Sequence, residues 1–285
     1  MTQFFPHRWR EISKVKSQNS KVKIQKDSHF EFSLLNFDFI SAVKKIFIFT
    51  KKPFVRKLTD NIFEEGQVLL IDKPIDWTSF DVVKKIRNMV RIRKVGHAGT
   101  LDPLASGLLI LCTGKFTKKI NEYMAQEKEY TGQITLGAVT PTYDLESEPV
   151  NFKGFEDITE KKIYDTLPRF TGEILQVPPM HSAIKKDGKR IYELARRGET
   201  IELEPRKITI KEFLITKIEL PAIHFKIVCS TGTYIRSLAN DFGAALGCGG
   251  YLSGLCRTRI GEFTLKDALS MEQAKNLIRE ALAPK

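Results

Sequence analysis

The sequence lacks the features that mark secreted, zinc-binding and membrane proteins. Its 285 residues include only four cysteines, which lie far apart and form no C-x-x-C pair: Cys112, Cys229, Cys248 and Cys256. Dispersed cysteines without a signal peptide indicate reduced thiols in the cytoplasm, without disulfides or zinc. No apolar run reaches the roughly 18 residues of a membrane-spanning helix. The nearest candidate, residues 37–50, is interrupted by Lys44 and Lys45.

Common metal and phosphate motifs are also missing. No H-x-x-x-H or E-x-x-H pair occurs, so we expect no metal site. Gly114-Lys115 cannot belong to a P-loop, because position 109 is not glycine and Phe116 stands where Ser or Thr is required. His224 lies on the polar side of an alternating segment and is expected at the surface. His181 receives no assignment.

The chain is strongly basic, with a formal net charge of +12 and a pI near 9.4. Such a balance favours a polyanionic partner. Residues 1–60 hold 13 Lys/Arg against 5 Asp/Glu, no glycine and nine of the 19 phenylalanines. They are interpreted either as a basic RNA-binding arm or as an appended, poorly ordered segment, such as an upstream start in the gene model. The break in composition favours the second interpretation.

Ordered structure is expected from about Gly66, in one domain over residues 61–285. Strands are predicted over 67–72, 130–136, 207–218 and 223–229, and helices over 79–90, 160–170, 190–197, 234–246 and 270–282. The two kinds of element mix without regular alternation, and no internal repeat is present. The fold class predicted is α+β, with a mixed, mostly antiparallel sheet flanked by helices.

The densest signal is the stretch Val95–Gly107, VGHAGTLDPLASG, which carries a lone carboxylate among glycines. A basic helix face precedes it (Lys84, Lys85, Arg87 and Arg91) and an apolar segment follows it. Taken alone, Asp102-Pro103 favours the start of a helix, with Asp as N-cap and Pro at the first position. His97, between small residues, is typical of a turn.

Further motifs in the same order along the chain change this interpretation. Residues 96–107 resemble the signature of the bacterial tRNA pseudouridine-55 synthases, the TruB family. The likeness extends from about Gly66 to Leu282 through these segments: Asp72-Lys73-Pro74, Lys128-Glu129-Tyr130, Ser182-Ala183-Ile184-Lys185, Gly232-Thr233-Tyr234-Ile235-Arg236, residues 246–250 and residues 255–259.

The resemblance implies an isomerase that breaks the N1–C1′ bond of uridine and joins C5 of the uracil to the same C1′. Asp102 matches the family's nucleophile, and the sequence leaves open whether it attacks C1′ or C6. Arg236 matches the arginine that pairs with this carboxylate and keeps it ionised. Tyr130 matches the tyrosine that stacks on the target base and takes part in removing the C5 proton. No cofactor is implied.

The family's substrate, the T-arm of tRNA, implies that the target base is flipped out of its loop. His97 matches a residue of that step, while Tyr234 and Leu255 match residues that line the uracil pocket. Lys73 and Lys185 are expected to contact the RNA backbone or the pocket. For Lys185-Lys186 and Arg196-Arg197, a solvated basic surface is an equal alternative.

Two departures from the family pattern stand out. Many members carry Asp where this chain has Pro141, although Asp144 is present. The C-terminal PUA domain of many relatives is also expected to be absent. The expected protein is a monomer without an obligate protein partner. Two other functions remain open: a guide-RNA-dependent synthase acting on ribosomal RNA, and a non-catalytic chaperone of the tRNA T-arm. The presence of Asp102 and Arg236 disfavours the chaperone.

Overall fold

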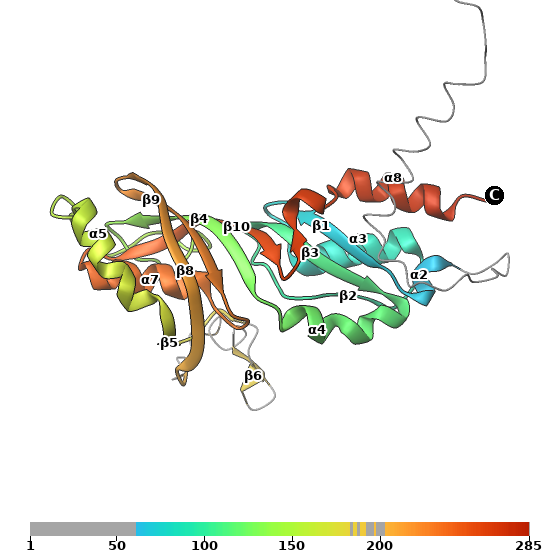
Figure 1. Cartoon of the computed structure of the whole chain (residues 1–285), viewed down its shortest axis with the longest axis horizontal. Helices are drawn as coiled ribbons and strands as arrows, with labels where there is room; N and C mark the ends of the chain where they lie inside the picture. Colours follow the sequence, from blue (N-terminus) through green and yellow to red (C-terminus); the bar gives the residue numbers. More distant parts are fainter. Residues whose placement is uncertain (1–60, 183–184, 187–188, 192–196, 198–202, 285) are drawn as a thin grey trace, which may run out of the picture. The chain divides into compact units, whose positions relative to one another are not determined.

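The alternating segments form one mixed sheet, because alternation lets each strand bury one of its faces. The computed structural model describes residues 61–182, 185–186, 189–191, 197 and 203–284, drawn in Figure 1. The strand order is β1-β3-β10-β4-β9-β8-β5, with β2 paired to β3 and β11 paired to β10. β10 runs parallel to β3, and the other pairings are antiparallel. The predicted fold class is therefore confirmed.

The strands of this sheet are β1 (Val68–Lys73), β2 (Val95–His97), β3 (Ala105–Thr113), β4 (Lys128–Leu136), β5 (Gly172–Gln176), β8 (Arg206–Glu219), β9 (Ala222–Cys229), β10 (Gly250–Ile260) and β11 (Phe263–Thr264). A separate two-stranded ribbon consists of β6 (Lys185–Lys186) and β7 (Lys189–Arg190). The α-helices are α2 (Ile62–Glu65), α3 (Ser79–Val90), α4 (Ile120–Met124), α5 (Glu160–Thr166), α7 (Ile235–Leu246) and α8 (Met271–Leu282). The 3₁₀ helices in the described residues are η1 (Gly114–Lys119), η2 (Leu167–Phe170) and η3 (Leu265–Asp267).

Several helix boundaries follow directly from local sequence. Thr78 and Asp81 form a reciprocal capping box at the start of α3, as Ser270 and Gln273 do for α8. Each box satisfies backbone N–H groups that the first helical turn leaves without a partner. Gly247 ends α7 in the left-handed conformation that glycine adopts without a steric cost.

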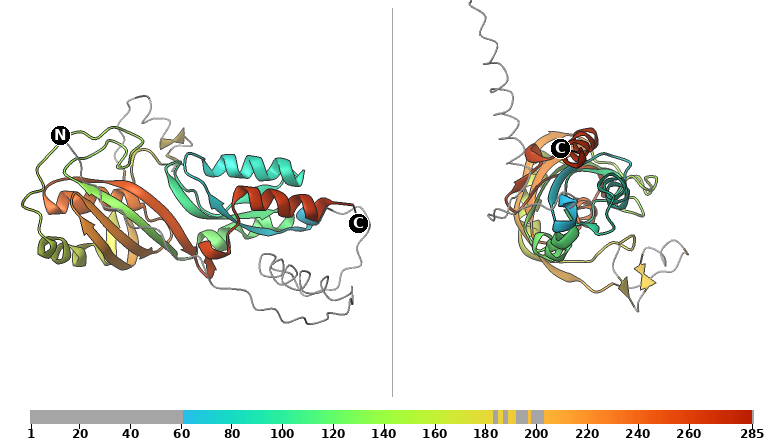
Figure 2. Two further views of the ribbon diagram at one scale, coloured as in Figure 1. Left: turned by 90° about the horizontal axis from the view of Figure 1, so that it is seen from above. Right: turned by 90° about the vertical axis from the view of Figure 1, so that its right-hand side faces the viewer.

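Helices cover both faces of the sheet at its β1–β3 end. Alternation sends Leu69 and Ile71 into a buried cluster with α3 and α8, and Figure 2 shows these two helices side by side. Val68 and Leu70 point the other way and pack in a cluster with residues of η1 and α4. A third cluster joins β4, β8 and β9 to α5 and α7. Full burial of each such side chain contributes about 1.5–3 kcal/mol, so these clusters fix the helices on the sheet.

One expectation for local structure needs correction, and a second lies mostly outside the described residues. Asp102-Pro103 does not begin a helix: the carbonyl of Asp102 accepts a hydrogen bond from the N–H of Ala105 at 3.1 Å, which closes a turn before β3. The helix expected over 190–197 falls mostly outside the described residues, and Arg190 itself ends strand β7. The central strand β10 carries no clear periodic signal, because Gly250, Gly254 and its polar residues interrupt the alternation.

The expectations for residues 1–60 lie outside the described residues. Within the part of the chain that the structure describes, no helix has both the length and the apolar character needed to cross a membrane.

Candidate active site

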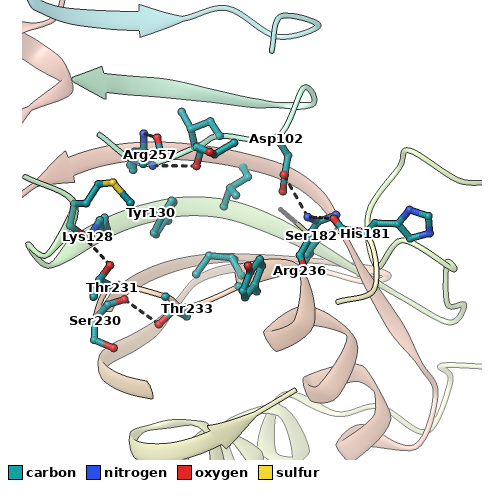
Figure 3. Close-up of a pocket in the computed structure, with 18 of the residues that line it drawn as sticks. Asp102, Lys128, Tyr130, His181, Ser182, Ser230, Thr231, Thr233, Arg236 and Arg257 are labelled. Atoms are coloured by element: carbon teal, nitrogen blue, oxygen red, sulfur yellow. Dashed lines mark hydrogen bonds and ion pairs between the residues drawn. The ribbon is translucent and has the colours of Figure 1, made fainter. Parts of the chain in front are cut away.

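Asp102 lies in the loop that connects β2 to β3, on the wall of a pocket of about 450 Å³ (Figure 3). Gly107, just after this loop, has a φ of +101°, and a Cβ there would lie 2.4 Å from the carbonyl oxygen of Arg257. Only glycine therefore allows β10 to run so close beside the loop. Glycine at position 107 thus allows the residues of β10 to lie directly beside the Asp102 loop.

Arg236, in the first turn of α7, reaches Asp102 across the pocket. Its Nη2 lies 3.3 Å from Oδ1 of Asp102, and its Nη1 lies 3.4 Å from Oδ2 of Asp144. Nη2 also donates to the carbonyl of His181 at 2.8 Å. The Arg236 side chain is only 5% exposed, against 36% for that of Asp102. The guanidinium of Arg236 is thus fixed by Asp144 and the His181 carbonyl, while the carboxylate of Asp102 remains accessible from the pocket.

The protonation of Asp102 reflects four influences. Burial raises the pKa of its carboxyl above the usual value and the negative charge of Asp144 raises it further, while the positive charges of Arg236 and Lys73 lower it. The net direction is upward. The ionised carboxylate is the form that attacks an electrophile, and the charge of Arg236 favours this form.

Two tyrosines and a leucine that the sequence assigns to the site line the same pocket: Tyr130, Tyr234 and Leu255. Tyr130 stands on β4, and burial raises the pKa of its phenol, opposed by the charge of Arg257. The backbone of Tyr234 is fixed in both directions by Gln176, whose amide accepts from its N–H at 2.8 Å and donates to its carbonyl at 3.0 Å. The pocket therefore places two tyrosine side chains and a leucine among mostly polar lining residues.

Lys73 and His97 do not line this pocket. The Lys73 side chain is fully buried, and its ammonium donates to the carbonyls of Pro74, Trp77 and Pro103 at 2.8, 2.5 and 3.2 Å. Burial lowers the pKa of Lys73 to about 8, which leaves it protonated at neutral pH. The expected contact of Lys73 with RNA is therefore corrected: it holds the residue that follows Asp102.

His97 ends β2, and its Nδ1 is buried without a hydrogen-bond partner among the described residues. Burial and the neighbouring charge of Arg257 lower the pKa of its imidazole, so the neutral form predominates at neutral pH. Lys185 begins the β6–β7 ribbon, and its side chain lies outside the described part of the structure.

Two basic residues of the site were not expected from the sequence. Arg257 is 1% exposed and clamps the Asp102 loop: its Nε donates to Leu108 O at 2.8 Å and its Nη2 to Gly99 O at 3.1 Å. Lys128 donates to the carbonyls of Met124 and Gln126 beside the pocket. Both residues lie in segments that the sequence analysis had singled out, Lys128-Glu129-Tyr130 and residues 255–259, but nothing in the sequence marked them as buried.

Asp144 is the third residue that was not assigned to the site. It is 5% exposed and pairs with Nη1 of Arg236, while Asp102 pairs with Nη2. Its loop is joined to β10, because the N–H of Leu252 donates to the carbonyl of Tyr143 at 2.9 Å. Only folding brings residues 102, 144 and 236 together. No group of three or more His, Cys, Asp or Glu side chains in the described residues is arranged to hold a metal ion.

Comparisons with known proteins agree with this geometry. Residues 87–235 match the model of the TruB family pseudouridylate synthase (N-terminal domain), and residues 236–283 match the tRNA pseudouridylate synthase B C-terminal domain. The tRNA pseudouridine synthase B of Flavobacterium johnsoniae is 55% identical over 221 residues, which are 75% of this chain and 96% of that protein. Its counterpart from Phocaeicola vulgatus is 51% identical over 216 residues, 74% of this chain and 92% of that protein.

Among solved structures, a chain in the crystal structure of a Cbf5-Nop10-Gar1 complex superposes with a TM-score of 0.61 at 29% identity. The match covers 79% of this chain and 57% of that one. The sheet, the pocket and the carboxylate–arginine pair thus define a pseudouridine synthase, an enzyme that isomerises uridine within RNA. The chain belongs to the TruB family of pseudouridylate synthases.

Proposed function

We propose that this protein converts uridine 55 in the T-loop of tRNA to pseudouridine, with Asp102 as the nucleophile. The observation that carries the proposal is the Asp102–Arg236 pair at 3.3 Å, whose carboxylate side faces the pocket. The curated relatives that align over nearly their whole length are named tRNA pseudouridine synthase B, and this supports tRNA as the substrate.

In the proposed reaction, the ionised carboxylate of Asp102 attacks either C1′ of the ribose or C6 of the uracil. The N1–C1′ bond breaks, the uracil turns, and a bond forms between C5 and C1′. The bond between Asp102 and the nucleotide breaks as well, which regenerates the free carboxylate. The C5 proton leaves and N1 ends up protonated, so the product is an isomer of the substrate. The sum of these steps involves no oxidant, reductant or transferred group, so the proposed reaction uses no cofactor.

Arg236 keeps Asp102 ionised and aimed at the pocket, because its guanidinium is itself fixed by Asp144 and the His181 carbonyl. Tyr130 stacks on the uracil as a neutral phenol, since its pKa is raised. A neutral phenol can take up the C5 proton only if another base accepts the phenol's own proton. The proposed role of Tyr130 in moving the C5 proton therefore requires such a base. Tyr234 and Leu255 form the remaining walls around the base.

The target base must leave its loop to reach Asp102, at a cost of a few kcal/mol. His97 takes part in this base flipping from the end of β2, as a neutral imidazole. Lys185 contacts the RNA backbone beside the pocket. Lys73 and Arg257 do not touch the substrate in this proposal; they hold the two ends of the Asp102 loop.

We further propose that the protein acts in the cytoplasm as a monomer, without an obligate protein partner. A guide-dependent enzyme is the main alternative, suggested by the likeness to a Cbf5 complex. The identity is 29% there, against 55% for a relative that is matched over 96% of its length. A purely RNA-binding chaperone would have no need for the Asp102–Arg236–Asp144 arrangement.

The direct test is mass-spectrometric mapping of pseudouridine in an unmodified tRNA transcript incubated with the purified protein. Pseudouridine at position 55 alone is expected. Asp102→Asn should reduce turnover below about a thousandth of wild type, since even a single acid–base group contributes about 10²–10⁴-fold. Binding of the transcript should persist, because the change removes no cation. Modification at another position, or substantial turnover by Asp102→Asn, would contradict the assignment.

A further inference from the structure

Positive charge in the described part of the chain is concentrated in one segment. Residues 84–119 contain nine Lys/Arg and one Asp/Glu, a net of +8. The rest of residues 61–285 contains 24 Lys/Arg against 28 Asp/Glu, a net of −4. The net charge of +4 over residues 61–285 is therefore a local property of this segment.

The fold gathers these cations on either side of the short strand β2. Lys84, Arg87 and Arg91 are spaced by three and four residues, so they share one face of α3. That face is turned toward β2, because Nη2 of Arg87 donates to the carbonyl of Val95 at 3.2 Å. Figure 1 shows β2 running between α3 and α4.

The loop between α3 and β2 adds two exposed cations, Arg93 and Lys94, and η1 adds the exposed Lys118. The two segments are joined at Lys94, whose carbonyl accepts from the N–H of Gly114 at 2.8 Å. We call these six residues the basic band: Lys84, Arg87, Arg91, Arg93, Lys94 and Lys118.

No cation of the basic band has a carboxylate partner within 4 Å among the described residues. Elsewhere many surface lysines are paired, as Lys161 is with Asp165, Lys207 with Glu173 and Lys217 with Glu219. Six unpaired cations on adjoining elements repel one another, and an anion with several charges in a row relieves that repulsion.

Both sides of the basic band lead to the catalytic pocket. β2 ends at His97 and continues into the Asp102 loop. On the other side, η1 continues into α4, whose last residue, Met124, lines the pocket. The two routes touch, because a Cβ on Gly96 would lie 2.7 Å from Cδ1 of Ile120. A strand of RNA that leaves the pocket over β2 would therefore pass along the band.

We propose that the basic band binds the phosphate backbone of the tRNA while its target uridine occupies the pocket. This inference rests on the proposed function, since it takes tRNA as the polyanion. Unpaired lysine and arginine side chains suit phosphates, whose binding releases counterions and depends steeply on salt. The contacts orient the RNA on the enzyme and carry no sequence information.

The test is the salt dependence of binding to an unmodified tRNA transcript. The triple variant Lys84→Gln/Arg93→Gln/Lys118→Gln removes one cation from each of the three elements. Each lost contact with a duplex phosphate lowers the slope of log K against log salt by about 0.9. We expect a slope shallower by about two to three units and affinity weakened at least about tenfold at physiological salt.

The matched control is Lys161→Gln/Lys207→Gln/Lys217→Gln, which changes the net charge equally at ion-paired lysines away from the band. Its slope should change by less than about one unit, and its activity should stay near that of wild type. Thermal unfolding of both variants establishes that each remains folded.

Equal slopes for the two triple variants would overturn the inference, as would a band variant that binds like wild type. Failure of the proposed function has a different signature: wild-type protein would bind the transcript without forming pseudouridine at position 55. The comparison of slopes is measured by binding alone and so remains decisive in that case.

Discussion

At the scale of single residues, the site is a row of alternating charges. Arg236 stands between Asp102 and Asp144, at 3.3 and 3.4 Å. Asp144 is buried and Asp102 is partly exposed, so the arginine is anchored on one side and presents a carboxylate to the pocket on the other. Arg236 lowers the pKa of Asp102, and Asp144 raises it.

Replacing the two neighbours of Asp102 should shift the pH dependence of catalysis in opposite directions. The ionised carboxylate is the reactive form, so the rate falls as the pH drops through its pKa. Arg236→Gln removes the charge that lowers this pKa, and the acid limb should move to higher pH. Asp144→Asn removes a like charge, and the limb should move to lower pH. Single-turnover rates on the tRNA transcript measure both shifts.

Arg236→Lys separates charge from orientation in the same assay. A lysine keeps the positive charge but cannot reproduce the two-sided geometry of the guanidinium. The acid limb should stay near its wild-type position while the plateau rate falls strongly, with a smaller loss of RNA affinity. Near-normal turnover of Arg236→Lys, or shifts of the same sign for the two neutral variants, would show that the arginine does not orient Asp102.

At the scale of elements, the Asp102 loop is precise because two strands hold it. Lys73 of β1 donates to Pro103 on one side, and Arg257 of β10 donates to Gly99 on the other. The parallel pairing of β10 with β3 begins at this loop, with Leu255 opposite Ala105 and Arg257 opposite Gly107. The catalytic residue thus sits on a loop, while its position is set by the sheet.

Gly107→Ala should destabilise the protein by about 2 kcal/mol or more and reduce turnover, because its methyl group would collide with the carbonyl of Arg257 at a positive φ. Gly254→Ala, three residues before Arg257 in β10, is the control: the atom nearest to its added Cβ would be Cβ of Gln133 at 3.8 Å. We expect a change in stability within about 0.5 kcal/mol for the control. Urea unfolding compares the two, and equal stabilities would contradict the close-approach argument.

At the scale of the whole molecule, positive charge is concentrated in two segments, and each is a candidate for binding RNA. Residues 1–60 carry a net of +8, and residues 84–119 carry the same net charge. The second segment has a defined place beside the pocket. The phenylalanines of the first show no repeated arrangement with its basic residues that would stack bases.

Deletion of residues 1–60 should therefore leave activity on tRNA within a few-fold of the full chain. The slope of log K against log salt should change by less than about one unit, because few of the 13 basic residues would then contact phosphate. Filter binding across a range of salt, together with thermal unfolding, measures both quantities. A slope shallower by several units would instead make this segment part of the RNA-binding surface.

The sequence by itself determined the elements whose signals are local. The capping boxes at Thr78 and Ser270, the glycine after α7 and the alternating strands all depend on residues within a few positions of one another. The motif residues Asp102, Tyr130, Arg236, Tyr234 and Leu255 were assigned through the resemblance of their segments to a known family, and the structure brings them to one pocket.

Only the tertiary structure decided the features that depend on contacts between distant residues. Asp144 anchors Arg236 across 92 positions, and Arg257 clamps Gly99 across 158. Lys73 resembles a substrate contact in the sequence and is buried by the fold, where three carbonyls satisfy its ammonium. Strand β10 shows no clear period in the sequence, and its pairing with β3 and β4 is what places it in the sheet. Whether a polar side chain is buried, and which group it hydrogen-bonds or pairs with, depends on residues that are distant in the sequence. A local sequence pattern therefore does not predict it.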